Sequence, residues 1–201
     1  MDWLLEGDPA IRWQALRDLT GASEQRVNRE RAHVAKEGWG ARLLALQEPS
    51  GQWGGGLYTP KWISTTYTLL LLRDFGLSPT NPQARQGCRL LLDEGFRRDG
   101  GINYGAWGSR GETCVTGMVL SLLACFGIVD DKLERIVEHL LERQMKDGGW
   151  NCRLPYGATH ASFHTTILVL EGLRAYEKFR PKLRREARQA LARGREFLLV
   201  H

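Results

Sequence analysis

The 201-residue sequence lacks any apolar stretch long enough to cross a membrane, and its start lacks the basic and apolar segments of a signal peptide. It has only four cysteines, too few for a disulfide scaffold at this length. Low-complexity segments and long linkers are also missing. These absences predict a cytoplasmic globular protein, and the hydrophobic content of 42% is enough to form a core.

The net charge is +5 and the pI is about 9.2. Arginines concentrate near both ends of the chain. No aromatic residues alternate with the arginines of 184–195, and no known nucleic-acid motif occurs. We therefore interpret the arginines as solvated helix faces and do not expect nucleic acid to be a partner.

One motif occurs three times, at intervals of about 50 residues. Residues 47–53 read Q-x-x-x-G-x-W, and residues 144–150 read the same way. Residues 96–102 keep the central glycine but have Phe96 and Ile102 at the two ends. A period of this length is typical of one repeated supersecondary unit whose neighbours stack and share a core.

Between the motifs the pattern predicts helices of two kinds. Strongly apolar runs, which predict buried helices, span Thr65–Phe75, Cys114–Phe126 and Phe163–Tyr176. Amphipathic helices are predicted over Gly40–Leu46, Gln83–Leu92, Lys132–Arg143 and Arg184–Val200. Each unit is therefore an amphipathic helix, a glycine-rich loop and a more buried helix.

This order predicts an all-α ring of helical hairpins over residues 35–201, with the apolar helices inside. A three-helix bundle or a HEAT-like stack is the alternative, but neither explains the glycine–tryptophan loops. Residues 1–34 are predicted to form a separate helical cap, in which Asp8 caps a helix that has Pro9 at its first position. The loop residues themselves are expected to be structural.

The Q-x-x-x-G-x-W motifs resemble those of the terpenoid cyclase and protein prenyltransferase superfamily, which includes the squalene cyclases. The resemblance covers residues 35–201 and implies an α/α toroid that acts on or binds an isoprenoid or other apolar molecule. The cyclases protonate their substrate with an Asp-x-Asp-Asp motif. This chain has none, since its only adjacent aspartates are Asp130 and Asp131. Proton-initiated squalene-type cyclisation is therefore disfavoured.

Prenyltransferase β-subunits bind zinc through Asp-x-Cys and a histidine at the starts of successive inner helices. Glu112-Thr-Cys114 and His164 resemble these elements. Alignment of the repeats places Thr65, Thr116 and Thr166 in register, which makes Cys114 and His164 equivalent. The predicted Zn²⁺ ligands are therefore Cys114, His164, Glu112 and Cys152, with His160 as a less favoured competitor.

A buried cysteine more often packs as a small hydrophobic residue. That interpretation is favoured for Cys88 and Cys125, which lie inside apolar runs. For Cys114 with His164 it is about as good as the zinc interpretation.

Aromatic residues gather near the predicted loop face, where they suit an isoprenoid chain. The substrate pocket is predicted to include Trp62, Tyr67, Tyr104, Trp107 and Phe163, with Tyr58 and Tyr156 nearby. Core packing explains several of these residues equally well.

The last residues, Phe197–His201, resemble the helix ends that precede Gln47 and Gln144, but no motif loop follows them. The sequence therefore predicts an incomplete ring. Further C-terminal repeats of a longer protein, or a second copy in a homodimer, would complete it.

The leading functional hypothesis is thus a zinc-binding, prenyltransferase- or cyclase-like toroid domain for an isoprenoid or other apolar substrate. If the chain is an enzyme, a zinc-dependent transferase or cyclase-like reaction is expected. The alternative is a non-catalytic helical-repeat scaffold that binds a partner protein or a lipid.

Overall fold

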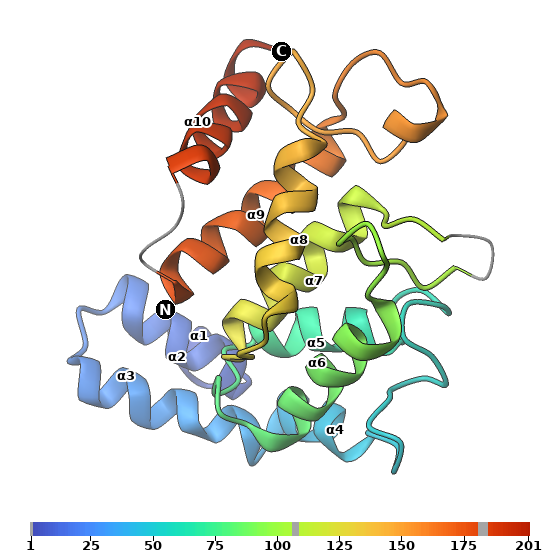
Figure 1. Cartoon of the computed structure of the whole chain (residues 1–201). Coiled ribbons are helices and arrows are strands. Elements are labelled where there is room, and N and C mark those ends of the chain that lie inside the picture. The colour runs from blue at the N-terminus through green and yellow to red at the C-terminus, as the bar shows by residue number, and fades with distance from the viewer. Residues whose placement is uncertain (1, 106–108, 181–184) are drawn as a thin grey trace. The chain divides into compact units, whose positions relative to one another are not determined.

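The computed structural model describes residues 2–105, 109–180 and 185–201, which are predominantly helical (Figure 1). Within these ranges the only β-structure is two isolated bridges, Trp53 with Gly56 and Phe96 with Ile102. The all-α prediction is confirmed. No helix in the described ranges has both the length and the apolar content needed to cross a membrane. The chain divides after Gly87 into two compact units, called unit 1 and unit 2 below.

Unit 1 holds the short helices of the N-terminal half. Its elements are α1 (Asp2–Leu5), α2 (Pro9–Leu19), α3 (Glu24–Arg31), the 3₁₀ helix η1 (Ala32–Ala35), α4 (Gly38–Ala45), α5 (Thr65–Asp74) and the start of α6 (Pro82–Gly95). The predicted N-cap is confirmed, because the Asp8 carboxylate accepts a hydrogen bond of 2.9 Å from the N–H of Ala10. The predicted boundary at residue 34 differs from the division at Gly87 and stays a prediction.

Unit 2 holds the end of α6 and four longer helices. These helices are α7 (Thr113–Cys125), α8 (Lys132–Glu142), α9 (Phe163–Phe179) and α10 (Arg185–Val200), and the 3₁₀ helix η2 (Leu154–Tyr156) lies before α9. Each predicted helix is present with ends shifted by at most a few residues, although Arg184 lies outside the described residues. The N–H of Lys132 at the start of α8 donates to the carboxylate of Asp130 over 2.9 Å.

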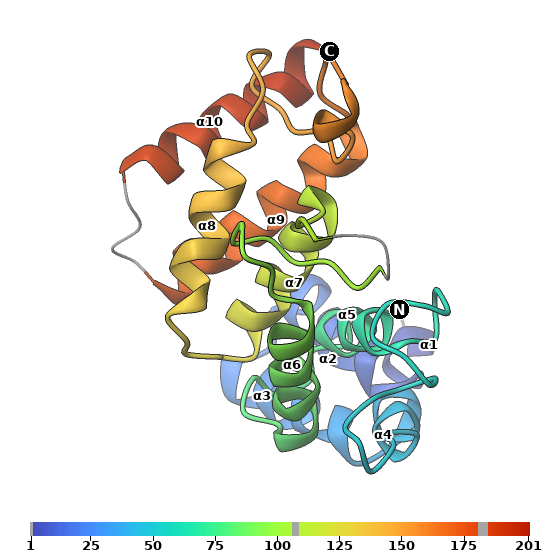
Figure 2. The same cartoon turned by 45° about the vertical axis from the view of Figure 1, so that its right-hand side comes forward.

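Helices α7 and α9 lie side by side, as both views show (Figure 1, Figure 2). Two glycines allow this close approach. A Cβ atom on Gly117 would lie 2.7 Å from the carbonyl oxygen of Leu168, and a Cβ atom on Gly172 would collide with the carbonyl oxygen of Gly117. The apolar run of α7 is therefore buried around nearly its whole circumference, as its composition predicts.

The three motif loops make the same backbone hydrogen bonds. Their central glycines, Gly51, Gly100 and Gly148, have positive φ values of 90°, 81° and 94°, which favour glycine. In each loop a backbone N–H donates to a threonine hydroxyl in the first turn of the next apolar helix. The pairs are Trp53 with Thr65 at 3.0 Å, Ile102 with Thr116 at 2.9 Å and Trp150 with Thr166 at 2.9 Å.

The glutamine and tryptophan side chains anchor the first and third loops in one common way. Each glutamine amide donates to the loop glycine carbonyl and to a carbonyl of the following amphipathic helix. Gln47 donates to Gly51 and Gln83, both at 3.0 Å, and Gln144 donates to Gly148 at 2.7 Å and Ala190 at 2.8 Å. The indoles of Trp53 and Trp150 donate to the carbonyls of Leu43 and Leu140, both over 2.7 Å.

Candidate functional site

Three aromatic residues of unit 1 form a cluster beside the start of α5, which we call the aromatic cluster: Tyr58, Trp62 and Tyr67. The ring of Tyr67 lies 5.2 Å from that of Trp62 and 5.5 Å from that of Tyr58, measured between centroids. The pocket predicted from the sequence includes Trp62 and Tyr67, and the structure brings these two side chains together.

The loop that carries the aromatic cluster is fixed to the first turn of α5. The hydroxyls of Thr65 and Thr66 donate to the carbonyls of Gly56 and Leu57, each over 2.7 Å. Trp62 itself is the only non-glycine residue with positive φ among the described residues, at 75°, and its side chain is 74% exposed. Trp62 thus combines a large exposed side chain with a backbone conformation that such residues rarely adopt.

Two of the predicted zinc ligands meet in unit 2. Cys114, the second residue of α7, lies near Cys152 and Glu112, close enough for both groups to act on its pKa. Burial above all, then the neighbouring Cys152 and Glu112, raises the pKa of the Cys114 thiol to about 12. The thiol is therefore protonated at neutral pH and is a poor nucleophile in this state.

The predicted histidine ligands lie on the surface. His164 is exposed at the second position of α9, and His160 is exposed in the preceding loop, where its carbonyl accepts a bond of 2.8 Å from the Asn151 amide. Across the three described ranges, no group of three or more His, Cys, Asp or Glu side chains is arranged to hold a metal ion. Of the predicted donor set, the structure brings Cys114 near Cys152 and Glu112, but not in an arrangement that holds a metal ion. Zinc binding therefore stays a prediction, which elemental analysis of protein purified without chelator would check.

Two other predicted pocket residues, Tyr104 and Phe163, belong to unit 2 and have their own neighbours there. Tyr104 of unit 2 packs over Gly95, and its hydroxyl donates to the carbonyl of Leu91 over 2.8 Å. Burial raises the pKa of Tyr104 well above its ordinary value. Phe163 contacts Phe197 of α10, with ring centroids 5.3 Å apart. Trp107 lies outside the described residues.

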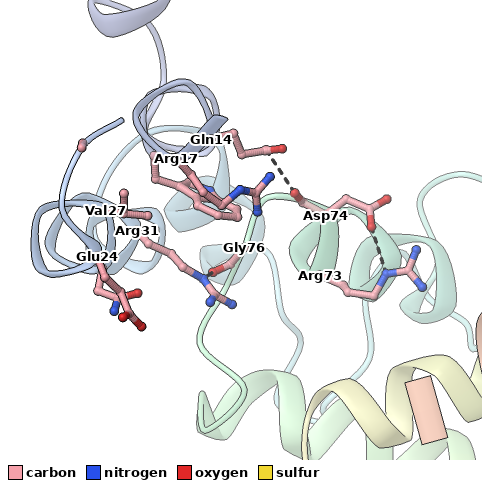
Figure 3. A pocket seen from close by; sticks show the side chains of 11 residues that line it. Gln14, Arg17, Glu24, Val27, Arg31, Arg73, Asp74 and Gly76 are labelled. Atoms are coloured by element: carbon pink, nitrogen blue, oxygen red, sulfur yellow. Dashed lines mark hydrogen bonds and ion pairs between the residues drawn. The ribbon is translucent and has the colours of Figure 1, made fainter. Parts of the chain in front are cut away.

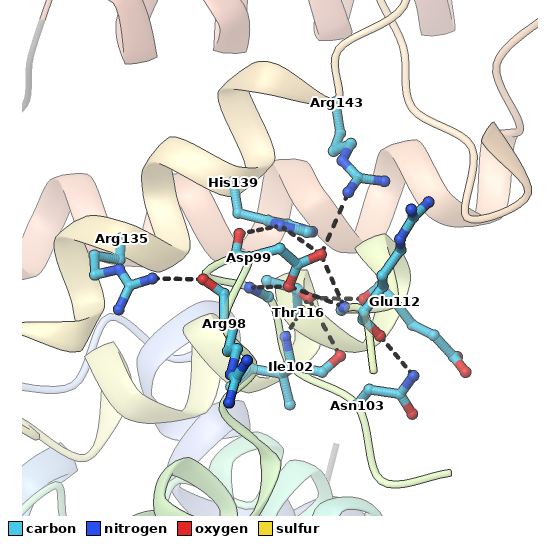
Figure 4. A network of polar contacts seen from close by, with 12 residues as sticks. Arg98, Asp99, Ile102, Asn103, Glu112, Thr116, Arg135, His139 and Arg143 are labelled. Carbon is cyan, nitrogen blue, oxygen red and sulfur yellow. Dashed lines mark hydrogen bonds and ion pairs between the residues drawn. The ribbon is translucent and has the colours of Figure 1, made fainter. Parts of the chain in front are cut away.

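A polar network around the second loop was missed by the sequence interpretation (Figure 4). The carboxylate of Asp99 accepts backbone N–H bonds from Gly101 at 3.2 Å and Gly111 at 3.1 Å, and a bond from Arg143 at 3.3 Å. Nδ1 of His139 lies 2.8 Å from the Asp99 carbonyl oxygen. Since a carbonyl can only accept, Nδ1 is the donor and carries a proton.

His139 is 1% exposed, and its Nε2 has no hydrogen-bond partner among the described residues. Burial lowers the pKa of His139, although the Asp99 carbonyl and carboxylate oppose this effect. The network therefore holds a neutral imidazole. Because Nε2 is enclosed by Gly101, the arrangement stabilises the loop and offers no access for a substrate.

Comparison of the chain with protein-family models, with curated proteins and with solved structures finds no match. The function must therefore be inferred from the chemistry of the site itself.

Proposed function

We propose that this chain is a helical-repeat domain of the α/α-toroid type that binds an isoprenoid or similar apolar molecule against the aromatic cluster. The observation that carries the proposal is Trp62, whose side chain is 74% exposed at a backbone φ of 75°. A non-glycine residue in this region costs on the order of 1–3 kcal/mol. The contact with Tyr67 compensates only part of this cost, because the residue as a whole is 74% exposed.

An apolar ligand would provide the missing contact. The rings of Trp62 and Tyr67 give adjoining flat surfaces on a loop that Thr65 and Thr66 hold in place. Each square ångström of apolar surface that the ligand covers contributes about 25 cal/mol. A fixed aromatic surface also loses little conformational entropy on binding, which favours affinity.

The toroid part of the proposal is supported by the three loops. The resemblance to the cyclase and prenyltransferase superfamily depends on the Q-x-x-x-G-x-W motifs. In all three loops the same backbone N–H donates to an equivalent threonine, although the second loop lacks both the glutamine and the tryptophan. Equivalent hydrogen bonds at equal positions are what a structural repeat requires.

The test is a titration of the protein with farnesol, followed by tryptophan fluorescence and calorimetry, in the wild type and in Trp62→Gly. The variant removes the indole and relieves the left-handed strain, so its stability should stay within about 1 kcal/mol of the wild type. Farnesol affinity should fall at least about tenfold, the loss expected when about 1.4 kcal/mol of contact energy is removed. Equal affinity in a folded Trp62→Gly protein would refute the proposal.

A second function, a scaffold for a partner protein, is favoured by the exposed face of α9 in unit 2. Phe163 and Ile167 are four residues apart on this helix, and both are about 45% exposed. Apolar residues at this spacing suit the binding of a partner helix or groove. The farnesol titration separates the two functions, because a scaffold has no reason to bind farnesol in a Trp62-dependent way.

A further inference from the structure

Unit 1 contains a pocket of about 590 Å³ between α2, α3 and the end of α5 (Figure 3). This volume lies within the range of small-molecule sites. Part of the wall is apolar and comes from Trp13, Ala22 and Val27. None of the lining residues belongs to the aromatic cluster, so the pocket is independent of the function proposed above.

Three arginines line the pocket: Arg17, Arg31 and Arg73. Two of them have a carboxylate partner. Arg17 is held by both oxygens of Asp18 at 2.6 and 2.7 Å, and Arg73 donates to Asp74 over 2.9 Å. The guanidinium groups of Arg17 and Arg31 lie 4.6 and 5.2 Å from the ring centroid of Trp13.

Arg31 differs from the other two. Its Nε donates to the carbonyl of Gly76 over 2.6 Å and a terminal nitrogen donates to that of Leu77 over 3.5 Å. Within the described ranges it forms no ion pair with a carboxylate. These carbonyls orient the guanidinium but do not neutralise it, so a half-buried positive charge stays without a counterion.

A second cavity of about 220 Å³ lies against the same side chain and is lined by Arg31, Asn28, Ser78 and Pro79, among others. Arg31 and Asn28 thus border both cavities. Glu24 and Asp74 also line the larger pocket and oppose an anion. With Asp18 on Arg17 and Asp74 on Arg73, the positive charges balance the negative ones around the pocket. Arg31 is still the one lining guanidinium that no carboxylate of the described residues pairs, and it is the group that can bind an anion.

We propose that this pocket binds a small organic anion, whose phosphate or carboxylate head pairs with Arg31 and whose apolar body lies against Val27, Ala22 and Trp13. An oxyanion matches the guanidinium in charge and geometry. The pocket is larger than a bare phosphate ion needs. The apolar wall therefore selects an anion that carries a ring or a short hydrocarbon body.

The test is calorimetric titration of the whole chain with phenyl phosphate, benzoate, benzyl alcohol and inorganic phosphate. We expect saturable binding of phenyl phosphate or benzoate at one site per chain, weaker binding of inorganic phosphate and none of benzyl alcohol. Whichever of phenyl phosphate and benzoate binds more tightly shows whether the pocket prefers a phosphate or a carboxylate head group. Saturable binding of neither would overturn the proposal.

Three variants locate the site. Arg31→Gln should weaken binding by about tenfold or more, the scale of one charge-assisted hydrogen bond. Arg29→Gln, an exposed charge on the same helix that does not line the pocket, should leave the affinity unchanged.

Glu24→Gln removes a negative charge that repels the anion from the exposed first turn of α3, so it should tighten binding severalfold. If Arg31→Gln does not fold, this variant tests the proposal in its place. Unchanged affinity in a folded Arg31→Gln protein, or in Glu24→Gln, would overturn the proposal.

Discussion

The second and third motif loops, both in unit 2, reach the same backbone conformation with different side chains. Each loop has an aspartate that accepts backbone N–H bonds, Asp99 in the second and Asp147 in the third. The third loop is also anchored by the amide of Gln144 and the indole of Trp150. The second loop has Phe96 and Ile102 at these positions, and its Asp99 makes further contacts with His139 and Arg143.

The two loops show which residues determine the backbone turn and which residues hold it against the neighbouring helices. The positive-φ glycine and the threonine acceptor are common to both loops, so they specify the turn. The side-chain anchors are interchangeable in geometry but not in chemistry. The buried imidazole gives the second loop a titratable group that the third loop lacks, so His139 is expected to make its stability depend on pH.

The largest expected change in stability is at Trp150, in the third loop. Trp150 is fully buried, so Trp150→Ala should lower the free energy of unfolding by about 3–5 kcal/mol through the cavity and the unpaired Leu140 carbonyl. Urea denaturation of the wild type and the variant measures this loss. The matched control is Trp62→Ala at the exposed indole, which should cost far less. Equal losses in the two variants would contradict the packing described for the third loop.

The shared threonine acceptors give a second test. Thr116→Val and Thr166→Val each leave one buried backbone N–H without its acceptor, at a cost of about 1–3 kcal/mol. Because the two bonds are equal in length and burial, the two losses should agree within about 0.5 kcal/mol. A clear difference between them in urea denaturation would mean that the loops are not equivalent.

The smallest effect concerns pH. The pKa of His139 is lowered in the folded state, so below its ordinary value of about 6.5 the unfolded chain binds the proton first. Stability should therefore be full above this pH and fall on acidification by at most about 1.4 kcal/mol per pH unit, down to the folded pKa.

Urea denaturation at pH 7.5 and 5.5 measures this difference in the wild type and in His139→Gln. The variant should lose much of the pH dependence, whereas a matched change at the exposed His164 of the same unit, His164→Gln, should keep it. An identical dependence in wild type and His139→Gln would exclude the buried imidazole as its source.

The sequence was sufficient for the helices and for the register of the loops. Apolar runs located α5, α7 and α9, and Thr65, Thr116 and Thr166, aligned in the sequence, make equivalent hydrogen bonds in the structure. The Asp99 network could have been found from two signals. Asp99 and Asp147 both precede a Gly-Gly pair, and His139 lies three residues after Ile136 on the apolar face of its helix.

The candidate site was less predictable, because it depends on where individual side chains point, which the spacing of residues in the sequence does not determine. Tyr67 and Tyr104 look alike as loop-face aromatics, but one joins the aromatic cluster and the other packs on Gly95. The contact of Cys114 with Cys152 follows from their placement, whereas the exposure of His164 depends on how much of the first turn of α9 is covered. The positive φ of Trp62 has no signal in the sequence.

The most direct test of the proposed function is photo-crosslinking with a benzophenone-bearing analogue of farnesol, followed by mass spectrometry of the labelled peptides. The account predicts that label is concentrated within residues 58–67, that excess farnesol competes it away, and that Trp62→Gly strongly reduces it. Labelling that avoids this segment, or that farnesol does not displace, would contradict binding at the aromatic cluster.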